Sequence, residues 1–213
     1  MSTAIIVVGA NGRMGRTISG LAANDPAYTL AGLVDSKEHL DALSGAGCPV
    51  ADSLEALLPQ VPGAVVIDFT APAVSLHSAR VAARTGHALV IGTTGLTGEQ
   101  KDELRALAEK APLFWSSNMS IGINVLLKIL PELTKALGES YDIEMVELHH
   151  NRKKDSPSGT ALMLADAINE ENDGAYHYVY DRSAVRQKRD PKEIGISSVR
   201  GGSIVGDHEV LFC

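Results

Sequence analysis

Short apolar runs and amphipathic stretches alternate in a regular order along the first 120 residues. Continuous apolar runs predict strands that are buried on both faces, at residues 4–9, 29–35, 64–70, 88–93 and 113–116. Stretches with helical spacing of apolar residues lie between them and predict helices at 11–23, 53–58, 73–84 and 97–110. Ser53 is the expected N-cap of the second helix, and the segment 97–100 resembles a capping box. Because parallel strands need crossover helices, this order predicts a doubly wound α/β sheet.

The second part of the chain has a different pattern. Residues 121–137 and 158–171 predict helices, and residues 142–149 predict a strand. The segment 172–193 is polar and charged. Residues 194–200 and 203–212 predict two strands joined at Gly201-Gly202, a two-residue hairpin signal. This part therefore predicts an α+β unit, and we expect two domains, residues 1–119 and 120–213.

Composition narrows the class of protein. With 45% hydrophobic and 21% charged residues, the proportions are those of a globular protein. A formal net charge of -7 disfavours nucleic acid as a partner, and no apolar run approaches the ~20 residues of a membrane helix. Two cysteines without a CxxC motif fit a reducing compartment. We expect a cytoplasmic protein without a nucleic-acid or membrane partner.

A glycine-rich loop lies between the first predicted strand and the first predicted helix. Residues 9–15, GANGRMG, have the spacing GxxGxxG, a variant of the dinucleotide-binding fingerprint. Asp35 ends the second strand, where it would accept hydrogen bonds from the adenine ribose. A plain tight turn is the alternative, but the strand–turn–helix context favours a cofactor loop. The predicted cofactor residues here are Gly9, Asn11, Gly12, Arg13, Met14, Gly15 and Asp35.

Three further strand ends belong to the same predicted edge. Ligands of open α/β sheets bind outside the carboxyl ends of the strands. Backbone amides and two hydroxyls in the segment 92–95 suit a nicotinamide carboxamide or a substrate. Each of these strand ends, taken alone, is also an ordinary loop signal. From them we predict as cofactor residues Phe69, Thr70, Gly92, Thr93, Thr94, Ser117, Asn118 and Met119.

Residues 147–160, ELHHNRKKDSPSGT, are the densest polar cluster in the chain. The segment 158–160 would present hydrogen-bond donors to an anion at a helix N-terminus, with Lys153 as a point charge beside it. Either His149 or His150 could be a general acid near neutral pH. The cluster predicts a pocket for a small polyanionic substrate that needs a proton.

The histidines do not predict a metal site. Adjacent residues on a strand point to opposite faces, and no HExxH motif or carboxylate triad accompanies His149 and His150. The other histidines, including His208, have no supporting motif and are assigned surface or structural roles.

These motifs together resemble the dihydrodipicolinate reductase family, which serves the diaminopimelate and lysine pathway of bacteria and plants. The likeness covers essentially the whole chain, and its EXHH…K…PSGTA signature is far more specific than the glycine loop. The matching segments are residues 9–15, 68–70, 90–95, 117–124, 147–150, 155–161 and 202–208.

The resemblance implies a Rossmann-type nucleotide domain, an α+β substrate domain, and a homotetramer joined through the substrate-domain sheets. It implies hydride transfer from NADH or NADPH to a cyclic dicarboxylate, 4-hydroxy-tetrahydrodipicolinate, giving tetrahydrodipicolinate and water. By the match, His149 is the proton donor, and Lys153 assists it and binds a substrate carboxylate. The remaining residues of the implied carboxylate cradle are His150, Ser158, Gly159 and Thr160, with Thr94 close by.

There are two alternatives to this interpretation, and the chain departs from the family pattern at one place. A non-catalytic nucleotide-sensing module would share the fold, but it would not need a histidine–lysine pair beside an anion cradle. A dehydrogenase of the amino-acid-semialdehyde type is the other alternative. Members of the family continue with a further strand and a helix, whereas this chain ends in the apolar segment 210–213, so we expect a C-terminally truncated chain.

Overall fold

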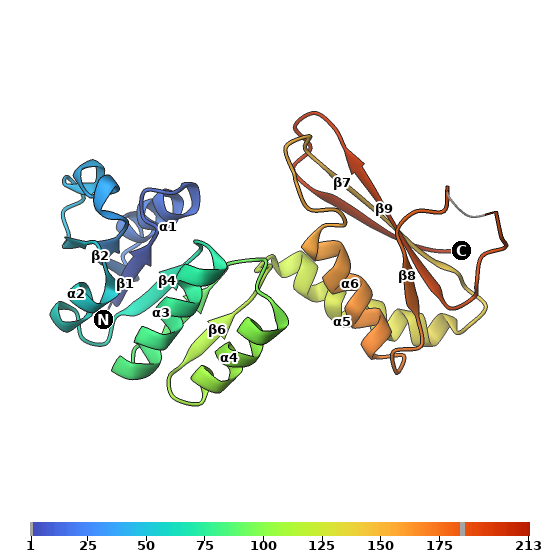
Figure 1. Cartoon of the computed structure of the whole chain (residues 1–213), viewed down its shortest axis with the longest axis horizontal. Coiled ribbons are helices and arrows are strands. Elements are labelled where there is room, and N and C mark those ends of the chain that lie inside the picture. Colours follow the sequence, from blue (N-terminus) through green and yellow to red (C-terminus); the bar gives the residue numbers. More distant parts are fainter. Residues whose placement is uncertain (1, 184–185) are drawn as a thin grey trace. The chain divides into compact units, whose positions relative to one another are not determined.

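The hydrophobic cores of the chain belong to two units, Met1–Ser117 and Asn118–Cys213. Figure 1 shows a sheet with its own helices in each unit of this computed structural model, which describes residues 2–183 and 186–213.

The first unit is a six-stranded parallel sheet with the strand order β3-β2-β1-β4-β5-β6. This order is that of a doubly wound nucleotide-binding sheet, so the predicted fold class is confirmed. Its strands are β1 (Thr3–Val8), β2 (Tyr28–Val34), β3 (Val50–Ala51), β4 (Val65–Asp68), β5 (Leu89–Ile91) and β6 (Leu113–Trp115). Its helices are α1 (Arg13–Asn24), α2 (Leu54–Leu57), α3 (Pro72–Thr85) and α4 (Gly98–Ala108).

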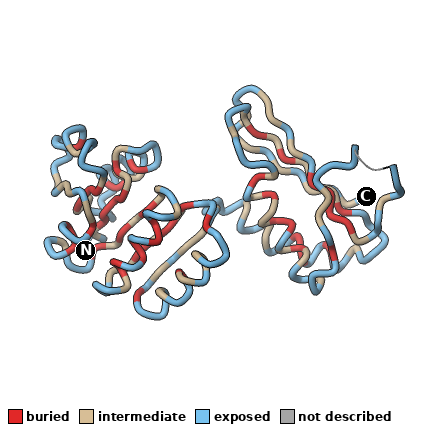
Figure 2. The backbone as a smooth tube through the Cα atoms, in the orientation of Figure 1, coloured by how far each residue is buried: buried red, intermediate tan, exposed pale blue. Residues whose placement is uncertain are grey.

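Both faces of this sheet are covered, which explains the unbroken apolar runs of its strands. Ile6 and Val8 of β1 pack in one cluster with residues of α2, α3 and α4, while Ile5 and Val7 pack in a second cluster with residues of α1. Figure 2 shows these buried positions concentrated along the strands. Alternate residues of one strand therefore belong to two different hydrophobic cores, as expected of a buried parallel sheet.

Local signals define where the helices of the first unit begin. The Ser53 hydroxyl accepts a hydrogen bond from Ala56 N and caps α2, as predicted. Thr97 and Gln100 form the predicted capping box at the start of α4. By contrast, α1 follows Gly12 and receives no side-chain cap among the described residues, which leaves its first-turn N–H groups available to a ligand.

The second unit is a mixed four-stranded sheet with the order β10-β7-β9-β8 and two helices on one face. Its strands are β7 (Ile143–His149), β8 (His177–Val179), β9 (Glu193–Arg200) and β10 (Asp207–Phe212). Helix α5 (Ile121–Leu137) and helix α6 (Gly159–Glu170) lie side by side and bury the inward residues of β7, β9 and β10. This arrangement confirms the predicted α+β character.

The predicted hairpin at Gly201-Gly202 is wrong. Strand β10 pairs antiparallel with β7, and β9 lies on the other side of β7, parallel to it. The link between β9 and β10 hydrogen-bonds to the end of β7 instead of turning back on β9: Gly201 N donates to His149 O, and Asn151 N donates to Gly202 O. The two glycines therefore belong to a crossover past the end of β7.

Two short strands have no clear sequence signal. Strand β8 lies in the polar segment 172–193 and pairs with the edge of β9 over three residues, and β3 has only two. The backbone next to β8 is fixed by a side chain, because the Asn169 amide both donates to Tyr176 O and accepts from Tyr176 N. A strand of two or three residues is too short to show an alternating hydrophobic pattern in the sequence, so its pairing cannot be predicted from such a pattern.

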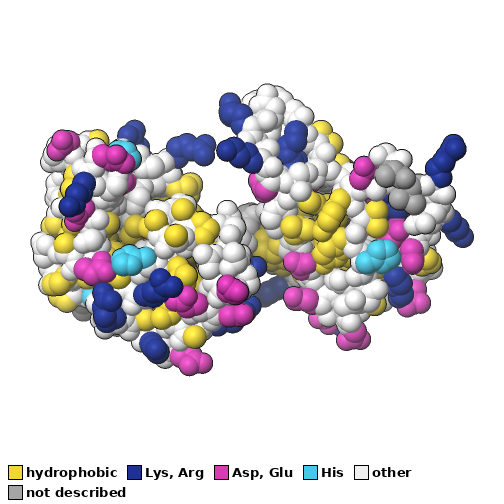
Figure 3. All heavy atoms as spheres, in the orientation of Figure 1, with side chains coloured by type: hydrophobic (Ala, Val, Ile, Leu, Met, Phe, Trp, Pro, Cys, Tyr) yellow, Lys and Arg dark blue, Asp and Glu magenta, His cyan; other side chains and the backbone are white. Residues whose placement is uncertain are grey.

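The surface matches the composition. Figure 3 shows acidic and basic side chains interspersed on the visible face of each unit. None of the helices in the described parts of the chain has the length and apolarity needed to cross a membrane.

The glycine loop depends on close packing at Gly15, which generates a testable prediction. A Cβ at Gly15 would lie 2.1 Å from the Gly9 carbonyl oxygen, whereas a Cβ at Gly20 in the same helix would meet nothing within 4 Å. We expect Gly15→Ala to lower the free energy of unfolding of the first unit by about 1–3 kcal/mol, because backbone must move. The matched control Gly20→Ala should stabilise the helix by about 0.5–1 kcal/mol.

Urea denaturation followed by tryptophan fluorescence checks this prediction, because the single tryptophan, Trp115, lies in the first unit. Equal effects of the two substitutions would show that Gly15 is not a packing constraint.

Candidate active site

The acid at the end of β2 holds the glycine loop in place. Asn11 N donates to Asp35 Oδ2 at 2.8 Å, and Gly9 N donates to Val34 O at 2.9 Å. Gly9 has a φ of 69°, and a Cβ there would lie 2.5 Å from Thr70 Cγ2. The loop thus forms a tight turn that only glycine fits, directly before the uncapped N-terminus of α1. Its backbone geometry fits the phosphates of a dinucleotide.

Asp35 itself is held by several donors. Its Oδ1 accepts from Ser36 N at 2.8 Å and lies 2.9 Å from His39 Nδ1. Burial raises the pKa of the Asp35 carboxyl, but the hydrogen bonds from Asn11, His39 and Ser36 outweigh burial and leave the pKa below its usual value. The carboxylate is therefore ionised at neutral pH. His39, to which the sequence assigns no role, is its side-chain partner.

A second carboxylate, Asp68, is fully buried at the end of β4 and orders two more strand ends. Its Oδ1 accepts from Thr70 N, Thr70 Oγ1 and Ser75 Oγ, and its Oδ2 accepts from Ser78 Oγ at 2.7 Å. The Ser75 hydroxyl also lies 2.6 Å from Thr93 Oγ1. One buried charge thus fixes the loops that follow β4 and β5.

This network corrects the expected role of one hydroxyl. The sequence predicts that Thr93 and Thr94 both present hydroxyls to a ligand. The Thr93 side chain is buried and turned toward Ser75, and its carbonyl accepts from Trp115 Nε1 at 3.1 Å, whereas Thr94 is exposed. A bound ligand can therefore reach the hydroxyl of Thr94 but not that of Thr93.

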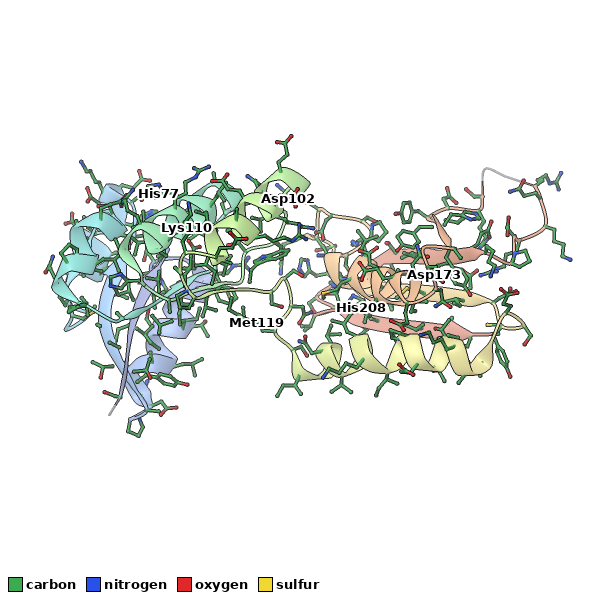
Figure 4. All side chains as sticks on the ribbon, turned by 90° about the horizontal axis from the view of Figure 1, so that it is seen from below. His77, Asp102, Lys110, Met119, Asp173 and His208 are labelled. Atoms are coloured by element: carbon green, nitrogen blue, oxygen red, sulfur yellow. The ribbon has the colours of Figure 1, made fainter. Side chains whose placement is uncertain are left out.

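The remaining predicted cofactor residues have separate environments. The Phe69 ring packs directly on Gly92, because a Cβ at Gly92 would lie 2.0 Å from the ring. Ser117 ends the first unit, while Asn118 belongs to the second, where its Nδ2 donates to Thr160 Oγ1 at 3.0 Å. Met119, labelled in Figure 4, follows Asn118 and is exposed.

The candidate site of the second unit lies where three strands change from apolar to polar side chains. The inward positions of β7 run Ile143, Met145, Glu147, His149. In the observed register, β9 places Ser198 beside Glu147 and Arg200 beside His149, and β10 places His208 beside Glu147. Figure 4 shows His208 on the sheet of this unit. Strand pairing therefore gathers residues that are far apart in sequence.

Glu147 is the fully buried centre of this polar cluster. Its Oε2 lies 2.5 Å from His149 Nδ1 and 2.8 Å from Arg200 Nη1, and its Oε1 accepts from Arg200 Nη2 at 2.6 Å and from Ser158 N at 3.1 Å. Burial raises the pKa of the Glu147 carboxyl, but hydrogen bonds from Arg200, Ser198 and His149 outweigh it and lower the pKa to about 2. Glu147 is therefore ionised over the whole physiological range.

His208 and Ser158 form the second layer of the cluster. His208 Nε2 lies 2.8 Å from Ser158 Oγ, and its ring meets the His149 ring edge-on with centroids 5.2 Å apart. Burial and the charge of His149 lower the pKa of His208, so its imidazole stays neutral near pH 7. The Ser158 hydroxyl also accepts from Ala161 N and caps α6. It is buried and engaged, so the predicted donation of this hydroxyl to a ligand does not match the structure.

Lys153, expected to meet a substrate carboxylate, lies next to a carboxylate of the chain. Its Nζ is 2.8 Å from Asp155 Oδ2, and the two side chains are 20% and 58% exposed. Burial raises the pKa of Asp155, but the hydrogen bond from Lys153 outweighs it and the pKa is lowered. Such partly exposed pairs contribute only about 0–1 kcal/mol, so an anionic ligand can compete for the lysine.

The sequence interpretation assigned His208 a surface or structural role and gave Arg200 none. A signal for both exists in the alternation of their strands. Counting back by two from Phe212 and Val210 leads to His208 on the inward face, and counting forward by two from Ile194 and Ile196 leads to Ser198 and Arg200. In the described parts of the chain, no group of three or more His, Cys, Asp or Glu is arranged to hold a metal ion.

The fold and these two sites define a class of protein. A parallel sheet of this order, a glycine loop after β1 and an acid after β2 make a Rossmann-type nucleotide-binding domain, here joined to an α+β unit with a polar cluster around Glu147. The model for the dihydrodipicolinate reductase N-terminus matches residues 3–119, and the model for its C-terminus matches residues 122–213. The chain belongs to the dihydrodipicolinate reductase family.

Relatives agree with this assignment. The chain is 65% identical to the 4-hydroxy-tetrahydrodipicolinate reductase of Desulfovibrio desulfuricans, an alignment that covers 100% of the chain and 83% of that relative. It is 42% identical to the enzyme of the same name from Caldanaerobacter subterraneus, over 100% of the chain and 81% of the relative. The solved dipicolinate-bound dihydrodipicolinate reductase from Paenisporosarcina sp. TG-14 matches with a TM-score of 0.76 and 27% identity, over 100% of the chain and 84% of that chain.

The lowered pKa of Glu147 predicts acid sensitivity. A carboxyl whose pKa falls from 4.5 when unfolded to about 2 when folded stabilises the protein above pH 4.5, and this contribution disappears as the pH falls from 4.5 to 2. The loss amounts to about 3 kcal/mol. Urea denaturation at pH 6 and pH 3 should show about 2 kcal/mol of this loss, because at pH 3 the carboxyl in the folded protein is still mostly ionised.

The variant Glu147→Gln should lose less stability between pH 6 and pH 3 than the wild type does. Glu103→Gln is the control, because Glu103 forms an exposed pair with Arg80 and should leave the pH dependence almost unchanged. An unchanged pH dependence in Glu147→Gln would contradict the assignment.

Proposed function

We propose that this protein reduces 4-hydroxy-tetrahydrodipicolinate with NADH or NADPH, giving tetrahydrodipicolinate and water. The observation that carries the proposal is the cluster of His149, Lys153 and the start of α6, found in a chain that is 65% identical to an enzyme of that name. The cluster combines a proton carrier with positive charge and helix N–H donors, which suit an anionic substrate that must be protonated.

The first unit supplies the proposed dinucleotide site. The loop 9–15 and the N-terminus of α1 would hold the pyrophosphate, and Asp35 would accept hydrogen bonds from the adenine ribose. The loops that follow β4 and β5, fixed by Asp68, would bind the nicotinamide half through Phe69, Gly92 and Thr94. The nicotinamide supplies the hydride when it is bound.

The second unit supplies the proposed substrate residues. Lys153, His150 and the backbone N–H groups of Gly159 and Thr160 would bind the carboxylates, with Lys153 exchanging Asp155 for the substrate. Hydride addition to the unsaturated ring builds negative charge, which a proton from His149 would neutralise. Such a general acid contributes about 10²–10⁴-fold to the rate.

The same unit is the proposed contact region of a homotetramer. The two helices cover one face of its sheet. Val199 on β9 and Leu211 on β10 belong to the opposite face and are exposed. Apolar residues on an uncovered sheet face favour association through that face.

The roles of His149 and Lys153 are tested by variants in an assay of NADH or NADPH oxidation with freshly generated substrate. We expect His149→Gln to lower kcat by about two orders of magnitude with little change in KM, because proton donation acts mainly in the transition state. Lys153→Ala should impair both kcat and KM, since the lysine binds as well as orients.

Cofactor binding by either variant is the control, because neither residue lies on the glycine loop. Normal turnover by His149→Gln together with loss of turnover by His150→Gln would show that the two histidines are assigned the wrong way round. Oxidation of cofactor with an amino-acid semialdehyde instead of the cyclic substrate would replace the proposed function by another dehydrogenase activity.

The ionised Asp35 predicts that NADH is used at least as well as NADPH, because its charge repels a 2′-phosphate. We expect Asp35→Asn to shift the ratio of the two dissociation constants toward NADPH by on the order of tenfold. Asp52→Asn is the control, since Asp52 pairs with Lys37 in the same unit. An NADPH preference of about a hundredfold or more in the wild type would contradict the role of Asp35.

A further inference from the structure

The ion pair between Glu147 and Arg200 lies against His149 in the second unit. The Arg200 guanidinium meets both carboxylate oxygens of Glu147, at 2.6 and 2.8 Å, and the imidazole of His149 meets one of them at 2.5 Å. The parallel register of β7 and β9 places Arg200 directly beside His149. Strand pairing therefore holds these three side chains in contact with one another.

The carboxylate decides which nitrogen of His149 carries a hydrogen. An ionised carboxylate only accepts hydrogen bonds, so Nδ1 of His149 must be protonated and donate to Glu147 Oε2. The nitrogen left to exchange a proton with another molecule is Nε2. Gly206 keeps room beside that atom, because a Cβ at Gly206 would lie 2.9 Å from Nε2. Glu147 thus aims His149 as well as holding it.

The guanidinium limits how strongly the carboxylate attracts a proton to His149. A carboxylate alone at this distance would stabilise the imidazolium and make it a reluctant proton donor. Arg200 places a positive charge on the same two oxygens, which offsets most of that attraction. Glu147 therefore orients the ring and attracts its proton, and Arg200 limits that attraction.

Resting on the proposed function, we propose that Glu147 and Arg200 are the positioning pair of His149. Glu147 fixes the imidazole with Nε2 free to transfer a proton, and Arg200 offsets the carboxylate charge, so that Glu147 orients the ring without binding its proton too firmly for transfer.

Among the described residues, this cluster also includes His208 and Asp207 on β10, and Lys153 and Asp155 in the loop before α6. Lys153 and Asp155 pair with each other, His208 hydrogen-bonds to Ser158, and Asp207 is exposed. The Glu147–Arg200 pair is therefore the dominant charged neighbour of the His149 ring.

The proposal is tested by NMR titration of the His149 ring in the intact protein, with its signal assigned by its loss in His149→Gln. We expect Glu147→Gln to lower the proton affinity of His149 and Arg200→Gln to raise it, each by about tenfold or more. A merely structural role would shift both variants in the same direction, toward the affinity of a free imidazole. Shifts of the same sign, or no shift, would overturn the proposal.

Two further variants sharpen the test. Arg200→Lys keeps the charge but not the two-pronged contact, and it should return the proton affinity of His149 most of the way to the wild-type value. Arg182→Gln removes an equal charge from the same unit, where Arg182 pairs with Glu144 and Glu193, and it should leave His149 unchanged. If Glu147→Gln does not fold, the comparison of Arg200→Gln with Arg200→Lys decides, because equal titrations would overturn the proposal.

The pH profile of kcat gives a second readout. The pH at which kcat falls on the alkaline side should be lower in Glu147→Gln and higher in Arg200→Gln, in the same directions as the NMR titrations. The titration needs no substrate, so opposite shifts in a protein without reductase activity would reject the proposed function and keep the positioning pair. Normal reductase activity together with unchanged His149 titrations in both variants would keep the proposed function and reject the positioning pair.

Discussion

The fully buried carboxylate of Glu147 is the constraint on which the second unit depends. Burying an unpaired charge costs several kcal/mol, so the chain must bring donors to it. It does so from three segments: Arg200 on β9, Ser158 N before α6, and His149 on β7 itself. A shift of β9 by one residue would turn Arg200 to the opposite face of the sheet. The position of this charge therefore specifies both the strand register and the start of α6.

Asp68 poses the same problem in the first unit and is stabilised by different donors. Three hydroxyls and one backbone N–H satisfy its carboxylate, and two of those hydroxyls, from Ser75 and Ser78, lie in the first turns of α3. The positive end of the helix dipole favours an anion at that place without a cation. A network of short hydroxyl side chains leaves little freedom, which suits a charge whose role is to fix loops.

The difference between local and long-range information explains what the sequence predicts. The strand–helix order of the first unit, apart from the two-residue strand β3, is local, as are the cap at Ser53 and the capping box at Thr97, and these are confirmed. The pairing of β10 with β7 is not local. Gly201-Gly202 has the composition of a tight turn, yet its backbone bonds to the end of β7. The motif 147–160 predicts a site, but its partners Arg200 and His208 lie on β9 and β10. The register of these two strands against β7 cannot be predicted from the sequence alone.

The two buried carboxylates also show why one needs an arginine and the other does not. Among the described residues, the donors to Asp68 are three hydroxyls and a backbone amide, and none of them belongs to an imidazole. Glu147 touches an imidazole, and its charge would bind a proton there too firmly for transfer if nothing offset it. Hydroxyl donors would stabilise Glu147 without offsetting that charge. A guanidinium does both at once, because its fork matches the two carboxylate oxygens and its charge cancels theirs.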